Sequence, residues 1–142
     1  MKLRNIICLV SAAALIAAVY LIIPEKDESQ PVYPESPAVS TVSDRISYFA
    51  SHGWEVEELA GRNIVIPSDL SGEYEEYVRM QDKQGLPLRK FAGRDAVLYL
   101  YDVKNYSPES RKMLAELIVC EDTAVASMVY SEDGGSIRLS VD

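Results

Sequence analysis

Few residues in this chain could carry acid–base or nucleophilic chemistry. The single histidine, His52, stands beside Gly53 and Trp54 at the predicted end of a short helix, where the helix dipole favours an exposed imidazole. A hydrolytic triad needs a base beside its nucleophile, and zinc needs several histidine or cysteine ligands. One histidine with Cys8 and Cys120 supplies neither. We therefore expect no catalytic residue, no metal site and no cofactor, and we interpret Cys120 as a buried apolar residue.

Carboxylates are abundant enough for a paired acid–base site or a calcium site. The candidates are Glu57-Glu58, Glu75-Glu76 and the segment Ser131-Glu132-Asp133-Gly134. Charged runs of this kind are usually solvated, and the last segment is typical of a hairpin turn. A carboxylate-dependent enzyme acting on cell-wall glycan or peptide is therefore an alternative function, and it requires two acids that face each other across a cleft.

Aromatic side chains give a stronger indication of a binding surface. Tyrosine and tryptophan combine a large apolar ring with a polar tip, which suits recognition. Most aromatic residues of the C-terminal part should belong to the core or its rim. Four could face outward and form an aromatic binding surface for a basic or extended peptide: Trp54, Tyr99, Tyr101 and Tyr106.

The charge is distributed unevenly along the chain, whose formal net charge is −8. Lys2 and Arg4 are the only charged residues before Pro24, so the rest of the chain holds 12 bases against 22 acids. Such an acidic surface repels nucleic acid and anionic lipid, because their binders need basic patches. We expect no nucleic-acid partner, whereas a basic protein or peptide partner fits the charge.

Residues 6–23 form an uncharged apolar run of 18 residues. As a helix this run would be about 27 Å long, close to the hydrocarbon thickness of a bilayer. Bases precede it and mostly acidic residues follow it, which places the N-terminus in the cytoplasm and the C-terminal part outside. We predict a single-pass cell-membrane anchor at residues 1–23. A cleaved signal peptide is the main alternative, although the run ends without the small residues of a good cleavage site.

Two regions follow the predicted anchor. Residues 24–42 contain four of the seven prolines among Glu, Ser and Gln, a composition that favours an extended spacer. Residues 43–142 are sufficient for one domain with one hydrophobic core. We therefore predict a small extracytoplasmic domain on a proline-rich linker.

Two helices are predicted in that domain. A short helix capped by Ser43 or Asp44 should run to residue 51, because these residues favour the N-cap position. A second helix should begin at Asp69 or Ser71 and end at Gly85. Glycine is favoured at this end because it adopts the left-handed conformation without strain.

The strand pattern indicates an α+β fold. Alternation predicts strands at residues 54–59 and 63–66 around a turn at Gly61, which would form a hairpin. The other predicted strands lie at residues 95–103, 113–120, 124–130 and 136–141. Since both faces of residues 95–103 are apolar, that strand should lie inside the sheet. We expect an antiparallel β-sheet meander packed with one or two α-helices, preceded by the transmembrane helix.

Several short sequences resemble a bacterial family known as domain of unknown function 4830. They are Arg45-Ile46-Ser47-Tyr48-Phe49, Gly53-Trp54-Glu55-Val56, Val65-Ile66-Pro67, Tyr74-Glu75-Glu76-Tyr77 and the stretches 88–93 and 99–106. Glu121-Asp122-Thr123 departs from the aspartate-glycine type of hairpin turn expected at that point. The resemblance implies a membrane-anchored or secreted protein with a domain over residues 43–142, and it supplies no activity, cofactor or site residue.

These observations favour one class of function over two others. The missing catalytic motifs, the anchor and the spacer predict a noncatalytic binding or interaction module outside the cytoplasm. The carboxylate-dependent enzyme is the alternative, and a sensor coupled through the membrane segment is a third.

Overall fold

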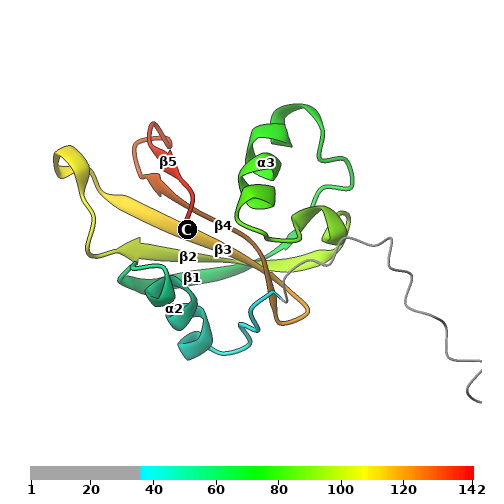
Figure 1. The fold of residues 1–142 in the computed structure, drawn as a ribbon, viewed down its shortest axis with the longest axis horizontal. Coiled ribbons are helices and arrows are strands. Elements are labelled where there is room, and N and C mark those ends of the chain that lie inside the picture. The colour runs from blue at the N-terminus through cyan, green and yellow to red at the C-terminus, as the bar shows by residue number, and fades with distance from the viewer. Residues whose placement is uncertain (1–35) are drawn as a thin grey trace, which may run out of the picture. The chain divides into compact units, whose positions relative to one another are not determined.

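A computed structural model describes residues 36–142, which form a five-stranded antiparallel sheet with two helices (Figure 1). The strands follow chain order across the sheet. The elements are α2 (Val42–Ser51), β1 (Val56–Val65), α3 (Glu75–Lys83), β2 (Asp95–Val103), β3 (Met113–Cys120), β4 (Thr123–Ser131) and β5 (Arg138–Leu139), with 3-10 turns at Gly72–Tyr74, Leu88–Phe91 and Pro108–Ser110. The predicted α+β class and antiparallel meander are confirmed.

The predicted transmembrane helix lies outside the described residues. Within residues 36–142, no helix combines the length and apolar character needed to cross a bilayer.

The N-cap of helix α2 lies two residues before Ser43, the nearer of the two predicted caps. Thr41 is its N-cap and accepts a hydrogen bond from the Asp44 amide, while the Asp44 carboxylate accepts one from the Thr41 amide. This reciprocal pair satisfies two amides that the first helical turn leaves open. Asp44 therefore belongs to the cap as its third helical residue. Gly53 follows the helix with a left-handed φ of 87°.

The predicted hairpin at Gly61 is wrong, because β1 is one continuous strand with a bulge at Leu59. Gly61 pairs with Tyr99 of β2, and a side chain at position 61 would come within 2.9 Å of the Tyr99 ring. The glycine therefore marks a close approach of the backbone to an aromatic ring rather than a turn.

Two separate apolar cores lie on opposite faces of the sheet, because neighbouring residues of a strand point to opposite sides. Figure 1 shows α2 below the sheet and α3 above it. The α2-face core includes Tyr48, Phe49, Tyr101, Leu117 and Val129. The α3-face core includes Ile66, Val78, Leu88, Ile118 and Ala126. Strand β2 contributes to both, which confirms the prediction that it is an inner strand.

The outer edge of β4 is covered by three different groups. At its start the amide of Val39 donates to the Asp122 carbonyl at 2.8 Å, and Val39 is fully buried. In the middle the Gln81 side chain donates to the Ser127 carbonyl at 3.0 Å and accepts from the Ser127 amide at 2.8 Å. Strand β5 pairs with the end. The folded part therefore begins before Ser43, inside the predicted linker.

The last strand is shorter than the predicted 136–141, because the chain leaves β4 after Leu139. Beyond that point, two side chains take the place of the backbone hydrogen bonds between strands. The Val141 amide donates to Gln84 Oε1 at 2.8 Å, and Trp54 Nε1 donates to the Val141 carbonyl at 2.7 Å. The C-terminal residues are thus held by α3 and by the segment before β1.

Candidate functional site

Tyr101 is a core residue, which corrects its prediction as part of an aromatic surface. Its side chain is fully buried, and its ring centroid lies 4.7 Å from that of Phe49. Burial raises the pKa of the Tyr101 phenol, and the Glu58 carboxylate raises it further, while Arg45 lowers it. The phenol oxygen has no hydrogen-bond partner among the described residues. Tyr101 therefore stabilises the packing of α2 on the sheet.

Trp54 and Tyr106 meet, but far from Tyr99. Their rings stand edge to face with centroids 5.7 Å apart, and Tyr106 is 38% exposed. They lie beyond the Val56–Val103 end of the β1–β2 pair, where Trp54 also holds the C-terminal segment. The four predicted aromatic residues therefore do not form one binding surface.

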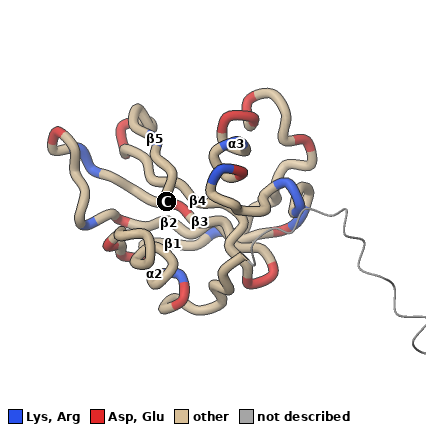
Figure 2. The backbone as a smooth tube through the Cα atoms, in the orientation of Figure 1, with Lys and Arg blue, Asp and Glu red and all other residues tan. Residues whose placement is uncertain are grey.

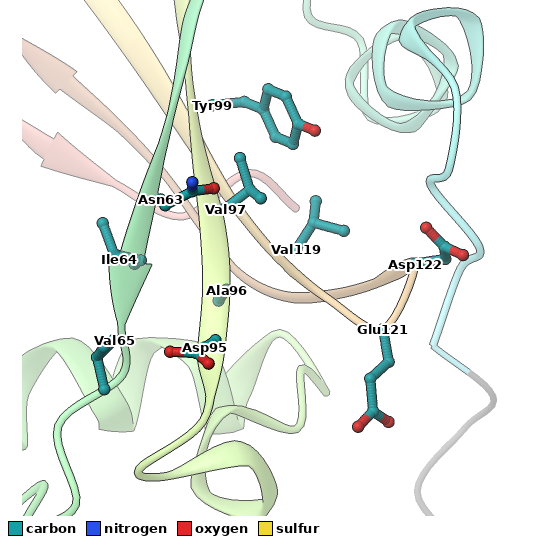
Figure 3. A pocket seen from close by; sticks show the side chains of 10 residues that line it. All are labelled: Asn63, Ile64, Val65, Asp95, Ala96, Val97, Tyr99, Val119, Glu121 and Asp122. Atoms are coloured by element: carbon teal, nitrogen blue, oxygen red, sulfur yellow. The ribbon is translucent and has the colours of Figure 1, made fainter.

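Tyr99 lines a hollow of about 690 Å³ at the other end of the sheet, shown in Figure 3 and called the acidic hollow below. This volume lies within the range of pockets that hold small ligands or side chains of a partner. The lining residues come from β1, β2, the end of β3 and the β3–β4 turn: Asn63, Ile64, Val65, Asp95, Ala96, Val97, Tyr99, Val119, Glu121 and Asp122.

The floor of the acidic hollow is apolar and only partly open, because Val97 is half-buried and Val119, 8% exposed, already packs in the α2-face core. Val97 of β2 and Val119 of β3 are register partners, and Figure 3 shows both beside Tyr99, with Val119 on the side of Asp122. At the β1 side, Val65 is 63% exposed. The apolar surface still open to a partner is therefore that of Val97 and Val65.

Tyr99 is held rigidly at the upper wall of the acidic hollow. Its ring lies over Gly61, and the Arg45 guanidinium carbon stands 3.8 Å from the ring centroid. Arg45 also forms an ion pair with Glu58 at 3.0 Å, and the two side chains are only 7% and 15% exposed. A ring fixed on both sides loses little conformational freedom when a ligand contacts it.

The rim of the acidic hollow carries three carboxylates, on Asp95, Glu121 and Asp122. Glu121 and Asp122 form the β3–β4 turn with left-handed φ angles of 51° and 60°. Primed hairpin turns require this conformation and normally use Asn or Gly. The departure noted in the sequence thus keeps the turn geometry but introduces strain and two acids. Arg94 pairs with Glu121 at 2.6 Å, which leaves the rim negative overall.

The other carboxylates considered from the sequence are mostly engaged with bases. Glu57 pairs with Lys104 at 3.0 Å, Glu58 pairs with Arg45, and Glu75 pairs with Arg79. Glu57 and Glu58 are neighbours on β1 and Glu75 lies on α3, and each of the three faces a base rather than another carboxylate. His52 caps the C-terminus of α2 and is exposed, where its sequence position placed it. Within residues 36–142 no three His, Cys, Asp or Glu side chains gather as metal ligands do.

Sequence reasoning missed the residues of the floor and rim. Val97 and Val119 read as ordinary strand residues, since nothing in a sequence shows where a helix stops covering a sheet. The rim had a detectable signal, because Glu121-Asp122 occupies a turn in which a glycine would be less strained.

Comparison with known proteins adds no family. No family profile matches the chain, and neither the curated proteins nor the solved structures give a significant match. The resemblance to domain of unknown function 4830 stays a prediction.

Proposed function

We propose that this protein is a noncatalytic binding module whose acidic hollow holds an extended basic segment of a partner outside the cytoplasm. The observation that carries the proposal is an apolar floor inside a negative rim, at the end of the sheet that α2 leaves open. In this proposal residues 6–23 anchor the chain in the cell membrane, with the N-terminus in the cytoplasm.

The two parts of the acidic hollow would contribute differently. An apolar side chain that becomes fully buried on Val97 and Val65 gains about 1.5–3 kcal/mol. Attraction between exposed charges at the rim gives at most about 1 kcal/mol for each pair. The floor therefore supplies most of the affinity, and the rim selects a basic segment over an acidic one.

The neighbouring edge of the sheet explains why an extended segment fits. Strand β1 is at the edge, and its residues Asn63–Val65 line the acidic hollow. An extended segment beside β1 could use the outward backbone groups of that strand while alternate side chains reach the floor. The charges and the bulge in β1 limit this pairing to a short stretch.

Binding can be measured with the full chain in lipid nanodiscs and short peptides in a calorimeter. The first probe is acetyl-Lys-Val-Lys-Val-Lys-amide. Its controls replace every lysine by glutamate, or every valine by glycine. We expect heat of binding only for the first peptide, and equal binding of the lysine and glutamate peptides would contradict the proposal.

Two double variants test the location. Glu121→Gln with Asp122→Asn removes two rim charges, and we expect about fivefold weaker binding of the lysine peptide. Glu73→Gln with Glu76→Gln removes the same charge from the exposed start of α3 and should leave binding nearly unchanged. Equal weakening by both pairs would mean that only the net charge attracts the peptide.

The membrane assignment has its own test. A C-terminally tagged chain should stay with the membrane after carbonate extraction and lose its tag to protease added to cells without their wall. Recovery of the tagged chain in the soluble cell fraction would overturn the anchor.

A further inference from the structure

A second, smaller hollow lies on the opposite face of the sheet, between α3 and β5, and is called the α3 groove below. Its volume is about 320 Å³, and its lining is mainly apolar. Tyr77, Leu88, Ile118 and Met128 belong to its walls and floor, and Glu116 and Arg138 are its charged members. This groove shares only Ile64 with the acidic hollow, so a ligand bound here is independent of the proposed function.

Glu116 is an unusual residue for the middle of this sheet face. Its neighbours across the strands are Leu100 and Met128, and Leu114 and Ile118 flank it on the same face of β3. Burial raises the pKa of the Glu116 carboxyl, although a hydrogen bond from Tyr77 and the nearby arginines act to lower it. An apolar residue would be more stable at this position, so the carboxylate is best explained by a ligand.

Three further groups define the charges around Glu116. The Tyr77 hydroxyl donates to Glu116 Oε1 at 3.0 Å, and burial together with this carboxylate raises the pKa of Tyr77 well above its usual value. Arg62 and Arg138 are both exposed, and both are close enough to lower the pKa of Glu116. The groove thus has an anionic floor and a cationic rim.

We propose that the α3 groove binds a short zwitterion, with a protonated amine on Glu116, an apolar stem over Met128 and an anionic group on Arg138. Each simpler ligand fits only part of the site. A lone cation would be repelled by the arginines, and a fatty-acid-like anion would be repelled by the Glu116 carboxylate. A neutral apolar ligand would cover Glu116 without compensating its charge.

The ladder register sets the length of the ligand. Glu116 pairs with Met128, whereas Arg138 pairs with Tyr130 two residues further along β4. These offsets place the Cα atoms of Glu116 and Arg138 roughly 12 Å apart. Because both side chains can reach toward each other, the stem should be about four to six carbons long, as in a lysine side chain or an ω-amino acid.

The probe for this proposal is 6-aminohexanoate, titrated into the full chain in nanodiscs with empty nanodiscs as the blank. Hexylamine, hexanoate and 1-hexanol have the same stem with one charge or none. We expect 6-aminohexanoate to bind at least tenfold more tightly than each of them. Equal binding of hexylamine and 6-aminohexanoate would overturn the zwitterion, and binding that follows apolar character alone would overturn the role of Glu116.

Two variants locate the charges, and each has a matched control. Glu116→Gln and Arg138→Gln should each weaken the binding of 6-aminohexanoate at least tenfold. Arg138→Gln should bring its affinity down to that of hexylamine. The controls, Glu132→Gln and Arg79→Gln, change exposed residues outside the groove and should have no effect. Unchanged affinity in Glu116→Gln, with thermal unfolding showing a folded chain, would refute the site.

The pH dependence gives a separate readout. Glu116 faces Tyr77, Tyr130, Arg62 and Arg138, and of these side-chain types only the carboxyl ordinarily titrates in the acidic range. The carboxyl of 6-aminohexanoate titrates there too, so the readout is hexylamine, whose binding should fall as the pH drops through the raised pKa of Glu116. A binding profile that stays flat down to pH 4 would contradict an amine held by this carboxylate.

Discussion

The two faces of the sheet differ in where they hold charge. On the α2 face, the nearly buried Arg45 and Glu58 neutralise each other, and the acids of the hollow stand on an exposed rim. Figure 2 shows how acidic and basic residues are distributed along the backbone. On the α3 face, Glu116 is half-buried on an apolar floor and is met by a tyrosine hydroxyl. Removing one partner of a buried ion pair destabilises the fold, because it leaves the other charge uncompensated. Replacing a buried charge that is incompletely compensated by an apolar residue stabilises the fold. Substitutions of these charged residues on the two faces should therefore change the free energy of unfolding in opposite directions.

The largest effect is expected for Arg45→Met. This change leaves Glu58 nearly buried without its base and removes the contact with the Tyr99 ring. We expect the free energy of unfolding to fall by about 3 kcal/mol. Chemical denaturation measures it, and adding Glu58→Leu should recover most of the loss. If the double variant is as unstable as Arg45→Met alone, packing of the arginine rather than its charge is the cause.

Glu116→Leu should act in the opposite direction. Replacing the carboxylate among apolar neighbours is expected to raise the free energy of unfolding by about 1–2 kcal/mol at neutral pH. Glu116→Gln at the same site keeps the shape, and Glu132→Gln serves as an exposed control. A loss of stability in Glu116→Leu would remove the contrast between the two faces.

The effect of Glu116 should also depend on pH. Its folded-state pKa is raised above the ordinary 4.5, so the folded chain holds this proton more tightly than the unfolded chain. The stabilising contribution of Glu116 is complete below about pH 4.5 and is lost as the pH rises through the raised value. The advantage of Glu116→Gln should therefore appear on going from acidic to neutral pH, which denaturation curves at several pH values would show.

A smaller gain is expected at the rim of the acidic hollow. Glu121→Asn with Asp122→Gly relieves two left-handed residues, and we expect about 1 kcal/mol of added stability. The same change removes two rim acids, so binding of the lysine peptide should weaken while the melting temperature rises. Stronger peptide binding would show that the acids are not part of the site.

The smallest effect is expected for Tyr101→Phe. This substitution removes a buried hydroxyl that has no hydrogen-bond partner among residues 36–142. The change in stability should stay within about 0.5 kcal/mol, since no bond is lost. Tyr48→Phe is the matched comparison, because its hydroxyl bonds Ser127 Oγ at 2.8 Å, and it should be destabilising by about 1 kcal/mol.

Helices and strands were predictable where the pattern of apolar and polar residues within one element is sufficient to identify it. Residues 95–103 read as an inner strand because both of their faces are apolar, and β2 has these bounds. Gly61 misled the prediction, because its role depends on Tyr99, which lies 38 positions later and becomes its neighbour only in the sheet. The end of helix α2 at Ser51 was predicted correctly, although its N-cap is Thr41 rather than Ser43 or Asp44.

The candidate sites were less predictable for a related reason. Tyr99 and Tyr101 alternate with the same period, and only the extent of α2 decides that one lines a hollow and the other is buried. Glu116 carried a usable signal, since it is the single charged residue in the run Met113–Cys120. Its significance required the register, which brings Leu100 and Met128 to its sides.

The attachment of Val39 to the β3–β4 turn has a mechanical consequence. The described chain enters the domain through two backbone hydrogen bonds, from Val39 to Asp122 and from Ala124 to Pro37. Tension arriving along the polypeptide from residue 36 would load these two bonds first. Because Asp122 is also a rim residue of the acidic hollow, a pull at residue 36 and a ligand in the hollow would act on the same turn.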